Sequence, residues 1–126
     1  MNTRRNPNAE PIMDAAASPY LEEGRALFNA GEHWHAHEAW EHLWLGLEGE
    51  EKLFAQGLIM GAAMLVQYGK GVQRGVENHY ANVRARCQGK SFWGIDGDAY
   101  LVQLRPFLDT PGLDPARVQL LRDSQN

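Results

Sequence analysis

The chain has 126 residues, of which 44% are hydrophobic and 22% are charged, and its formal net charge is −4. This length suits one domain with its own core, and the charge excludes the broad basic surface that recruits nucleic acid or an anionic membrane. The single cysteine, Cys87, excludes an internal disulfide and is typical of a reducing compartment. The longest apolar stretch, residues 57–66, is about half of the ~20 residues that a membrane span needs. We therefore expect a soluble, cytoplasmic protein that binds neither nucleic acid nor membrane.

The first half of the chain predicts an N-terminal arm and two helices. Residues 1–17 combine Asn, Pro and Arg with an Ala triplet and show no sustained period, which predicts a flexible arm. Ser18-Pro19 is an N-cap followed by proline at the first helical position, and it begins a helix that Gly31 ends. A second helix is expected over residues 32–46, because apolar residues recur there at helical spacing.

The third predicted helix, from about residue 51 to residue 69, is the expected centre of the domain. It is apolar on nearly every side from Leu53 to Val66, which indicates a buried helix. Glycine weakens a helix interior by about 1 kcal/mol relative to alanine. Gly57 and Gly61 therefore indicate that another backbone passes very close to this helix.

The second half of the chain predicts further helices and no sheet. A fourth helix is expected over residues 72–88, and Asp96 caps a fifth that runs to about Leu108. Asp114-Pro115 opens a short last helix to about Arg122. No alternating strand pattern of useful length is present. The expected fold class is therefore all-α: residues 18–126 form a compact, single-domain bundle of five to six helices around the central apolar helix.

The chemistry is concentrated between Glu32 and Leu47, in the stretch EHWHAHEAWEHLWLGL. It contains four of the five histidines, three acids and three of the four tryptophans. A solvent-facing helix rarely carries so many indoles, and a core helix rarely carries so many ionisable groups. The combination predicts either a ligand site or a buried polar network.

A metal site is the first interpretation of this stretch. His37 and Glu41 lie one turn apart on the edge of the apolar sector, and His79 lies in the middle of the apolar face of the fourth helix. Two imidazoles and a carboxylate would suit zinc, iron(II) or manganese. Glu38 would then be the catalytic base. The zincin motif itself is absent, because Glu41 stands where its second histidine belongs.

A satisfied polar network is the second interpretation, and it needs no metal. In it His37, Glu41 and His79 hydrogen-bond one another and Gln56 of the central helix, which fixes the register of the helices. The remaining candidates for this network or for a ligand site are Trp40, Trp44 and His33. His33, His35 and His42 are otherwise expected to be surface histidines. A third interpretation keeps acid–base chemistry without a cofactor, through Glu38 or Glu41 desolvated by a neighbouring indole.

The same stretch resembles a known family signature. Residues 28–44, FNAGEHWHAHEAWEHLW, closely resemble the signature of the domain of unknown function 309 family, and residues 55–59, AQGLI, resemble its Gln-Gly-Leu-Ile-Gln segment. Met60 departs from the second glutamine of that segment. Gly71 and Gly75 are similar to its Gly-x-x-x-Gly helix start, and residues 94–96 to its Gly-Ile-Asp turn. The resemblance extends from about Leu21 to Leu108.

This resemblance implies a small all-α bundle and, for several members, the label of a predicted metal-dependent hydrolase. The polar residues of the signature correspond to His37, Glu38, Glu41 and Gln56. Two hypotheses follow. The chain is a metal-dependent hydrolase, or it is a non-catalytic helical module in which the cluster is architectural or binds a small molecule. A homo-oligomer is compatible with the second.

Overall fold

The computed structural model describes residues 11–12 and 14–121, and this part of the chain is almost entirely helical. Its α-helices are α1 (Pro19–Asn29), α2 (His33–Leu45), α3 (Gly49–Gly69), α4 (Gln73–Cys87) and α5 (Gly97–Leu104). Three 3-10 helices and one small hairpin complete it: η1 (Ala15–Ala17), η2 (Arg105–Leu108), η3 (Pro115–Arg117), β1 (Ser91–Phe92) and β2 (Ile95–Asp96). The all-α fold class is confirmed.

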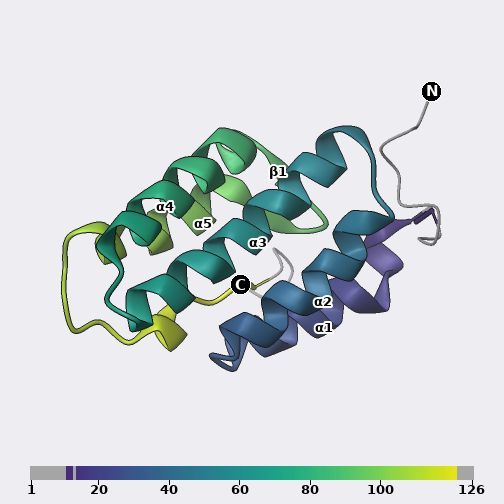
Figure 1. Ribbon diagram of the computed structural model, residues 1–126. Helices are drawn as coiled ribbons and strands as arrows, with labels where there is room; N and C mark the ends of the chain where they lie inside the picture. The colour runs from purple at the N-terminus through teal and green to yellow at the C-terminus, as the bar shows by residue number, and fades with distance from the viewer. Residues whose placement is uncertain (1–10, 13, 122–126) are drawn as a thin grey trace.

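Helix α3 is the centre of the bundle, as its sequence predicts. It packs against α2 on one side and α4 on the other, and α1 lies against α2. Figure 1 shows α2, α3 and α4 side by side with α3 in the middle. Residues on several sides of α3 are buried, Phe54, Leu58 and Leu65 among them. Helix α3 therefore lies between α2 and α4 (Figure 1), and side chains of these two helices face each other over its surface.

The predicted helix signals act as expected. The Ser18 hydroxyl accepts from the Tyr20 N–H at the start of α1, and the Asp96 carboxylate accepts from two N–H groups at the start of α5. Gly31 ends the first helical segment with a φ of 83°, a left-handed conformation that glycine adopts without a steric penalty. Asp114 likewise caps η3 through the Ala116 N–H. These local signals therefore fix the starts of three elements.

The close approaches to α3 are made by side chains rather than by a backbone. The Sγ atom of Cys87 lies at Gly57, and the Tyr100 ring lies at Gly61. A Cβ at either glycine would overlap these atoms. The Tyr100 hydroxyl also donates a hydrogen bond of 3.0 Å to the Leu58 carbonyl. The two glycines therefore admit α4 and α5, although the expected backbone contact is replaced by a thiol and a phenol.

A short hairpin connects α4 and α5, although the sequence predicts no strand there. Ser91 pairs with Asp96 and Phe92 with Ile95, around a two-residue turn in which both residues, Trp93 and Gly94, have positive φ. Two positive φ values are typical of a type I′ turn, whose usual sequence is Asn-Gly rather than Trp-Gly. The Phe92 and Trp93 rings pack against Phe54, so both residues anchor this segment to α3.

The two ends of the described chain differ from expectation. The last predicted helix, residues 114–122, is only the 3-10 turn η3, and residues 118–121 after it are not helical; residue 122 lies outside the described residues. Residues 1–10 and 13 of the predicted arm also lie outside them. Within that arm, Ala15 is buried and the Ile12 N–H donates to the Gly46 carbonyl, so packing begins before Ser18.

Over the part of the chain that the structure describes, no helix is both long enough and apolar enough to cross a bilayer.

Candidate functional site

Most of the candidate residues lie on helix α2, two faces of which pack against different helices. It packs against α1 and α3, and it buries Ala36, Ala39, Trp40 and Leu43 between them. A helix held on two sides has rows of residues along each edge of the contact, and these edges are partly accessible. His37, Glu41 and Trp44 follow one another at i, i+4 and i+7, so they share one such edge.

His37 is the best enclosed polar side chain of this edge. Its side chain is 17% exposed, and the Trp34 indole stacks on its ring with 5.0 Å between the centroids and 11° between the planes. Trp34 itself is 54% exposed. The Glu41 carboxylate Oε1 lies 3.6 Å from His37 Nδ1, which is too long for a hydrogen bond. His37 therefore points inward as predicted, whereas Glu41, 55% exposed, does not.

His79 lies across α3 from His37, as the sequence predicts. It is partly buried on α4, and burial lowers its pKa, with the neighbouring His37 lowering that pKa further. The second effect requires the two imidazoles to lie within electrostatic range. Nδ1 of His79 and Nδ1 of His37 are both buried and have no hydrogen-bond partner among the described residues. The structure thus brings the two histidines into one region without pairing them.

Trp44 adds a third unpaired nitrogen to this region. Its Nε1 is buried and finds no acceptor in the described part of the chain. An indole N–H can only donate, so it needs an acceptor. The Lys52 ammonium lies 4.2 Å from the centroid of the Trp44 ring, in a cation–π contact. We refer to His37, Glu41, Trp44 and His79, with Trp34 as their cover, as the His37 cluster.

Glu38, the predicted catalytic base, lies on a different side of α2. Its side chain is exposed and lines a hollow of about 460 Å³ between α1 and α2, on the outer surface. His35 and His42 line the same hollow, and both are exposed as expected. A second hollow of about 320 Å³ also includes Glu38, together with Glu41 and Trp44 at its margin. A proton acceptor at Glu38 would therefore serve the outer surface and the margin of the His37 cluster at Glu41 and Trp44, since neither hollow is lined by His37 or His79.

Two other candidates, Trp40 and Gln56, have hydrogen-bond partners outside the His37 cluster. Trp40 is fully buried, and its Nε1 donates to the Leu21 carbonyl over 3.3 Å, so it is a core residue. Gln56 accepts from the Arg86 guanidinium over 3.0 Å and is therefore engaged by α4, not by α2. The predicted hydrogen-bonded network of His37, Glu41, Gln56 and His79 is accordingly not formed among the residues described.

His33 is buried, contrary to the expected surface position. Only 7% of the residue is exposed, and its ring contacts Phe28 edge-on at 4.9 Å between centroids. Burial lowers its pKa, and the carboxylates of Asp114 and Glu32 oppose that effect. The effect of Asp114 on this pKa indicates that the start of η3 lies near His33. No pattern within α2 could have indicated this long-range contact.

The described residues do not form a ready-made metal centre. No group of three or more His, Cys, Asp or Glu side chains within them is arranged to hold a metal ion. His37 and Glu41 could supply two ligands from one helix, but His79 does not join them in this conformation. Two residues of this region are not among the candidates that the sequence predicts: Trp34, at i−3 from His37, and Lys52. The spacing of Trp34 could have indicated it, whereas the position of Lys52 over Trp44 depends on packing.

Comparison with known proteins supports the family resemblance. Residues 21–78 match the model of the family described as Domain of unknown function (DUF309), as the signature predicts. The match covers most of α1, all of α2 and α3 and the first part of α4, and so includes every residue of the His37 cluster except His79. The rest of the expected range, residues 79–108, lies outside the match. Searches of curated proteins and of solved structures returned no match.

Proposed function

We propose that this chain is a non-catalytic helical module that binds a small molecule with hydrogen-bond acceptors at the His37 cluster. The observation that carries the proposal is the set of three buried nitrogens, on His37, Trp44 and His79, without a hydrogen-bond partner among the described residues. A buried polar group without a partner costs about 1–3 kcal/mol. A ligand that accepts from the Trp44 indole N–H and hydrogen-bonds to the imidazole nitrogens would recover part of that free energy, which gives the site a reason to bind.

Trp34 supports this proposal because it offers a way in. Its indole covers one face of His37 and is itself more than half exposed. An exposed side chain changes rotamer on the picosecond-to-nanosecond timescale. Rotation of Trp34 would open the imidazole to a ligand and would need no movement of the helices. A planar ligand could then take the place of the indole on His37.

The experiment follows the indole N–H signals of the tryptophans by ¹H–¹⁵N NMR. We expect N-methylacetamide or acetate, used as acceptor probes, to shift the Trp44 signal, which a Trp44→Phe variant assigns. The shift should be lost in His37→Ala and kept in His42→Ala, where an exposed histidine of the same helix is removed. A Trp44 signal that responds to neither probe while the protein stays folded would contradict the proposal.

A metal-dependent hydrolase is the second candidate, and one distance favours it. His37 Nδ1 and Glu41 Oε1 lie 3.6 Å apart, a separation compatible with two ligands of one ion. Zinc, iron(II) or manganese would need His79 as a third ligand, and Glu38 would have to act as base from the outer surface. Because the described residues do not fit a three-ligand centre, we derive no catalytic step from them.

Elemental analysis separates the two candidates. About one metal ion per purified chain, lost in His37→Ala, would favour the hydrolase and count against the ligand module. Metal-free protein whose Trp44 signal responds to the probes would favour the module. The proposal keeps a cytoplasmic location, on the basis of the single buried thiol. Given the net charge of −4, it includes neither nucleic acid nor membrane as a partner.

A further inference from the structure

The last described residues, 118–121, lie across the bundle as a non-helical segment that we call the C-terminal strap. Val118 has an extended backbone conformation, with φ −76° and ψ 124°. Val118 and Leu120 are buried, whereas Leu121 is 51% exposed. Burial at alternate residues is typical of an extended chain with one side turned to the protein. The strap therefore occupies a surface site in the way that a bound peptide would.

On the side of α5, one glutamine binds the backbone of the strap. The Gln103 side-chain amide donates to the Gln119 carbonyl over 2.7 Å, and its oxygen accepts from the Gln119 N–H over 2.9 Å. These are the two bonds that a residue of a neighbouring β-strand would make. A single carboxamide thus takes the place of a strand partner.

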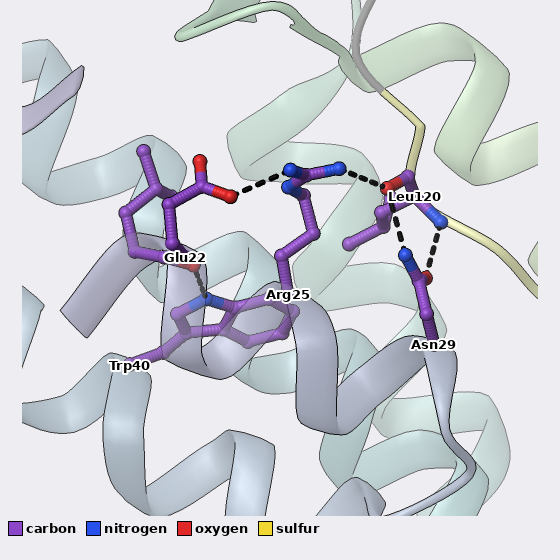
Figure 2. A network of polar contacts seen from close by, with 6 residues as sticks. Glu22, Arg25, Asn29, Trp40 and Leu120 are labelled. Atoms are coloured by element: carbon purple, nitrogen blue, oxygen red, sulfur yellow. Dashed lines mark hydrogen bonds and ion pairs between the residues drawn. The ribbon is translucent and has the colours of Figure 1, made fainter. Parts of the chain in front are cut away.

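On the side of α1, one asparagine makes the equivalent pair of bonds. The Asn29 amide donates to the Leu120 carbonyl over 3.1 Å, and its oxygen accepts from the Leu120 N–H over 2.7 Å. The Arg25 guanidinium donates to the same carbonyl over 3.1 Å. Figure 2 shows Asn29 and Arg25 both directed at Leu120, with Glu22 bound to Arg25. All four backbone polar groups of Gln119 and Leu120 are therefore bound by side chains of α1 and α5.

We infer that the surface between α1 and α5 is a peptide-binding site, which the strap fills intramolecularly. Its ligand is an extended segment of another polypeptide with bulky apolar residues two positions apart, as Val118 and Leu120 are in the strap. Side chains that bind only backbone atoms accept many sequences. The preference comes from the two buried side chains and from Gln119, whose side-chain amide donates to the Asn29 carbonyl over 2.9 Å. A hollow of about 270 Å³, lined by Gln103, Leu120 and Leu121 among others, leaves room beside the strap.

The strap can leave this site with the helices in place, at the cost of uncovering the part of the hydrophobic core to which Val118 and Leu120 belong. Among the residues described, no backbone–backbone hydrogen bond holds residues 119–121. Opening therefore breaks side-chain bonds and exposes two apolar side chains, and it leaves every helix intact. A tethered segment competes at an effective concentration of about millimolar. A partner peptide is consequently expected to bind weakly until the strap is weakened. This site is separate from the His37 cluster.

Hydrogen exchange of the wild-type protein provides the first test. We expect the Gln119 and Leu120 amide protons to exchange by local opening, at least about tenfold faster than the amide of Leu58 in α3, with little dependence on denaturant. Exchange of these two protons only through global unfolding, at the rate of Leu58, would overturn the inference. This test needs no variant and so cannot fail through misfolding.

The second test adds a fluorescent peptide of residues 115–121 to the full-length protein and measures anisotropy. A Leu120→Ala variant, in which the strap is weakened, should bind the peptide about tenfold or more tightly than the wild type, because lost buried methylenes free the site. The same peptide methylated at the Leu120 nitrogen should not bind, since it cannot donate to Asn29. A folded Leu120→Ala protein that binds neither peptide would overturn the inference.

Variants of the site complete the test. In the Leu120→Ala background, Asn29→Ala or Gln103→Ala should weaken peptide binding about tenfold or more, since each removes two backbone contacts. Asn78→Ala and Gln88→Ala change exposed residues of the same types and should leave binding unchanged. Equal binding by all four variants would place the peptide elsewhere and overturn the inference.

Discussion

Burial separates the histidines of α2 into groups with different chemistry. His35 is 61% exposed and pairs with Glu32 across one helical turn, so it is a surface residue. His33, two residues earlier, is buried and its ring contacts Phe28, with the Asp114 carboxylate near enough to raise its pKa against the effect of burial. His37 lies between these extremes, under Trp34. Helix α2 thus carries a buried imidazole in His33, one covered by a mobile side chain in His37, and an exposed one in His35. Only His37 suits reversible access by a ligand.

His33 should make the protein less stable in mild acid. Burial lowers its folded-state pKa below the ordinary value of 6.5, so the unfolded chain binds more protons as the pH falls. The free energy of unfolding should therefore decrease below about pH 6.5, by at most about 1.4 kcal/mol per pH unit for one proton. His79, whose pKa is also lowered, contributes in the same direction. Urea unfolding between about pH 5 and pH 8 measures the effect.

A His33→Gln variant should show a smaller decrease over this pH range, because it lacks the buried group that protonates on unfolding. His42→Gln, at an exposed position of the same helix, is the matched control and should keep the wild-type pH dependence. If His33→Gln and the wild type lose stability with the same slope, His33 is not the group that links folding to protons.

At the scale of elements, the packing around α3 depends on a small residue at one contact. The Tyr100 ring of α5 lies where a side chain at Gly61 would be, and its hydroxyl is bound to the Leu58 carbonyl. Gly61→Ala should therefore lower the free energy of unfolding by about 1–3 kcal/mol, the usual cost of overpacking. Gly69→Ala is the control, since no atom of the described residues lies within 4 Å of a Cβ there.

The control should be neutral or slightly stabilising, because alanine is the better helix former by about 1 kcal/mol. Chemical unfolding of both variants gives the comparison. Equal stabilities would mean that α5 shifts freely away from α3, which the buried Tyr100–Leu58 hydrogen bond argues against. In that case the bundle would be less tightly constrained than its contacts indicate.

Local signals were enough to predict most helix starts but not the non-helical segments. Ser18, Asp96 and Asp114 each act through hydrogen bonds within three residues, so their role is visible in sequence. The hairpin was missed because its turn is Trp93-Gly94, not one of the usual hairpin pairs. Asp114-Pro115 predicts a helix that continues through the strap. The strap is instead extended, and the hydrogen bonds that hold it come from Asn29 and Gln103, which are distant in the chain and leave no local signal.

The candidate site was predicted in part for the same reason. Helical spacing correctly places His37 inward. It cannot say how far the neighbouring helices cover this edge of α2, and the Glu41 side chain is 55% exposed. The central position of His79 on α4 was predicted from its apolar neighbours. The engagement of Gln56 by Arg86 could not be predicted, since several polar residues on two helices were equally compatible partners.

The buried thiol of Cys87 is a probe of cooperative unfolding of the bundle. This thiol is fully buried and lies against Gly57 of α3. The backbone carbonyl of Cys87 lies next to Gly97 of α5. Burial raises its pKa to about 12, so the reactive thiolate is scarce at neutral pH. A reagent can reach this sulfur only when α3, α4 and α5 separate. Opening of the C-terminal strap, which leaves these helices in place, should not expose it.

Labelling of Cys87 by a disulfide reagent should therefore require global unfolding. We expect the labelling rate at neutral pH to rise with urea in proportion to the unfolded fraction, and to be negligible in native buffer. The control carries Asn78→Cys with Cys87→Ala, which places the thiol on the exposed side of α4 and should react at once without urea. Labelling of Cys87 at a rate independent of urea would contradict this expectation. It would show that α4 opens on its own, so that His79 could approach His37 without unfolding of the bundle.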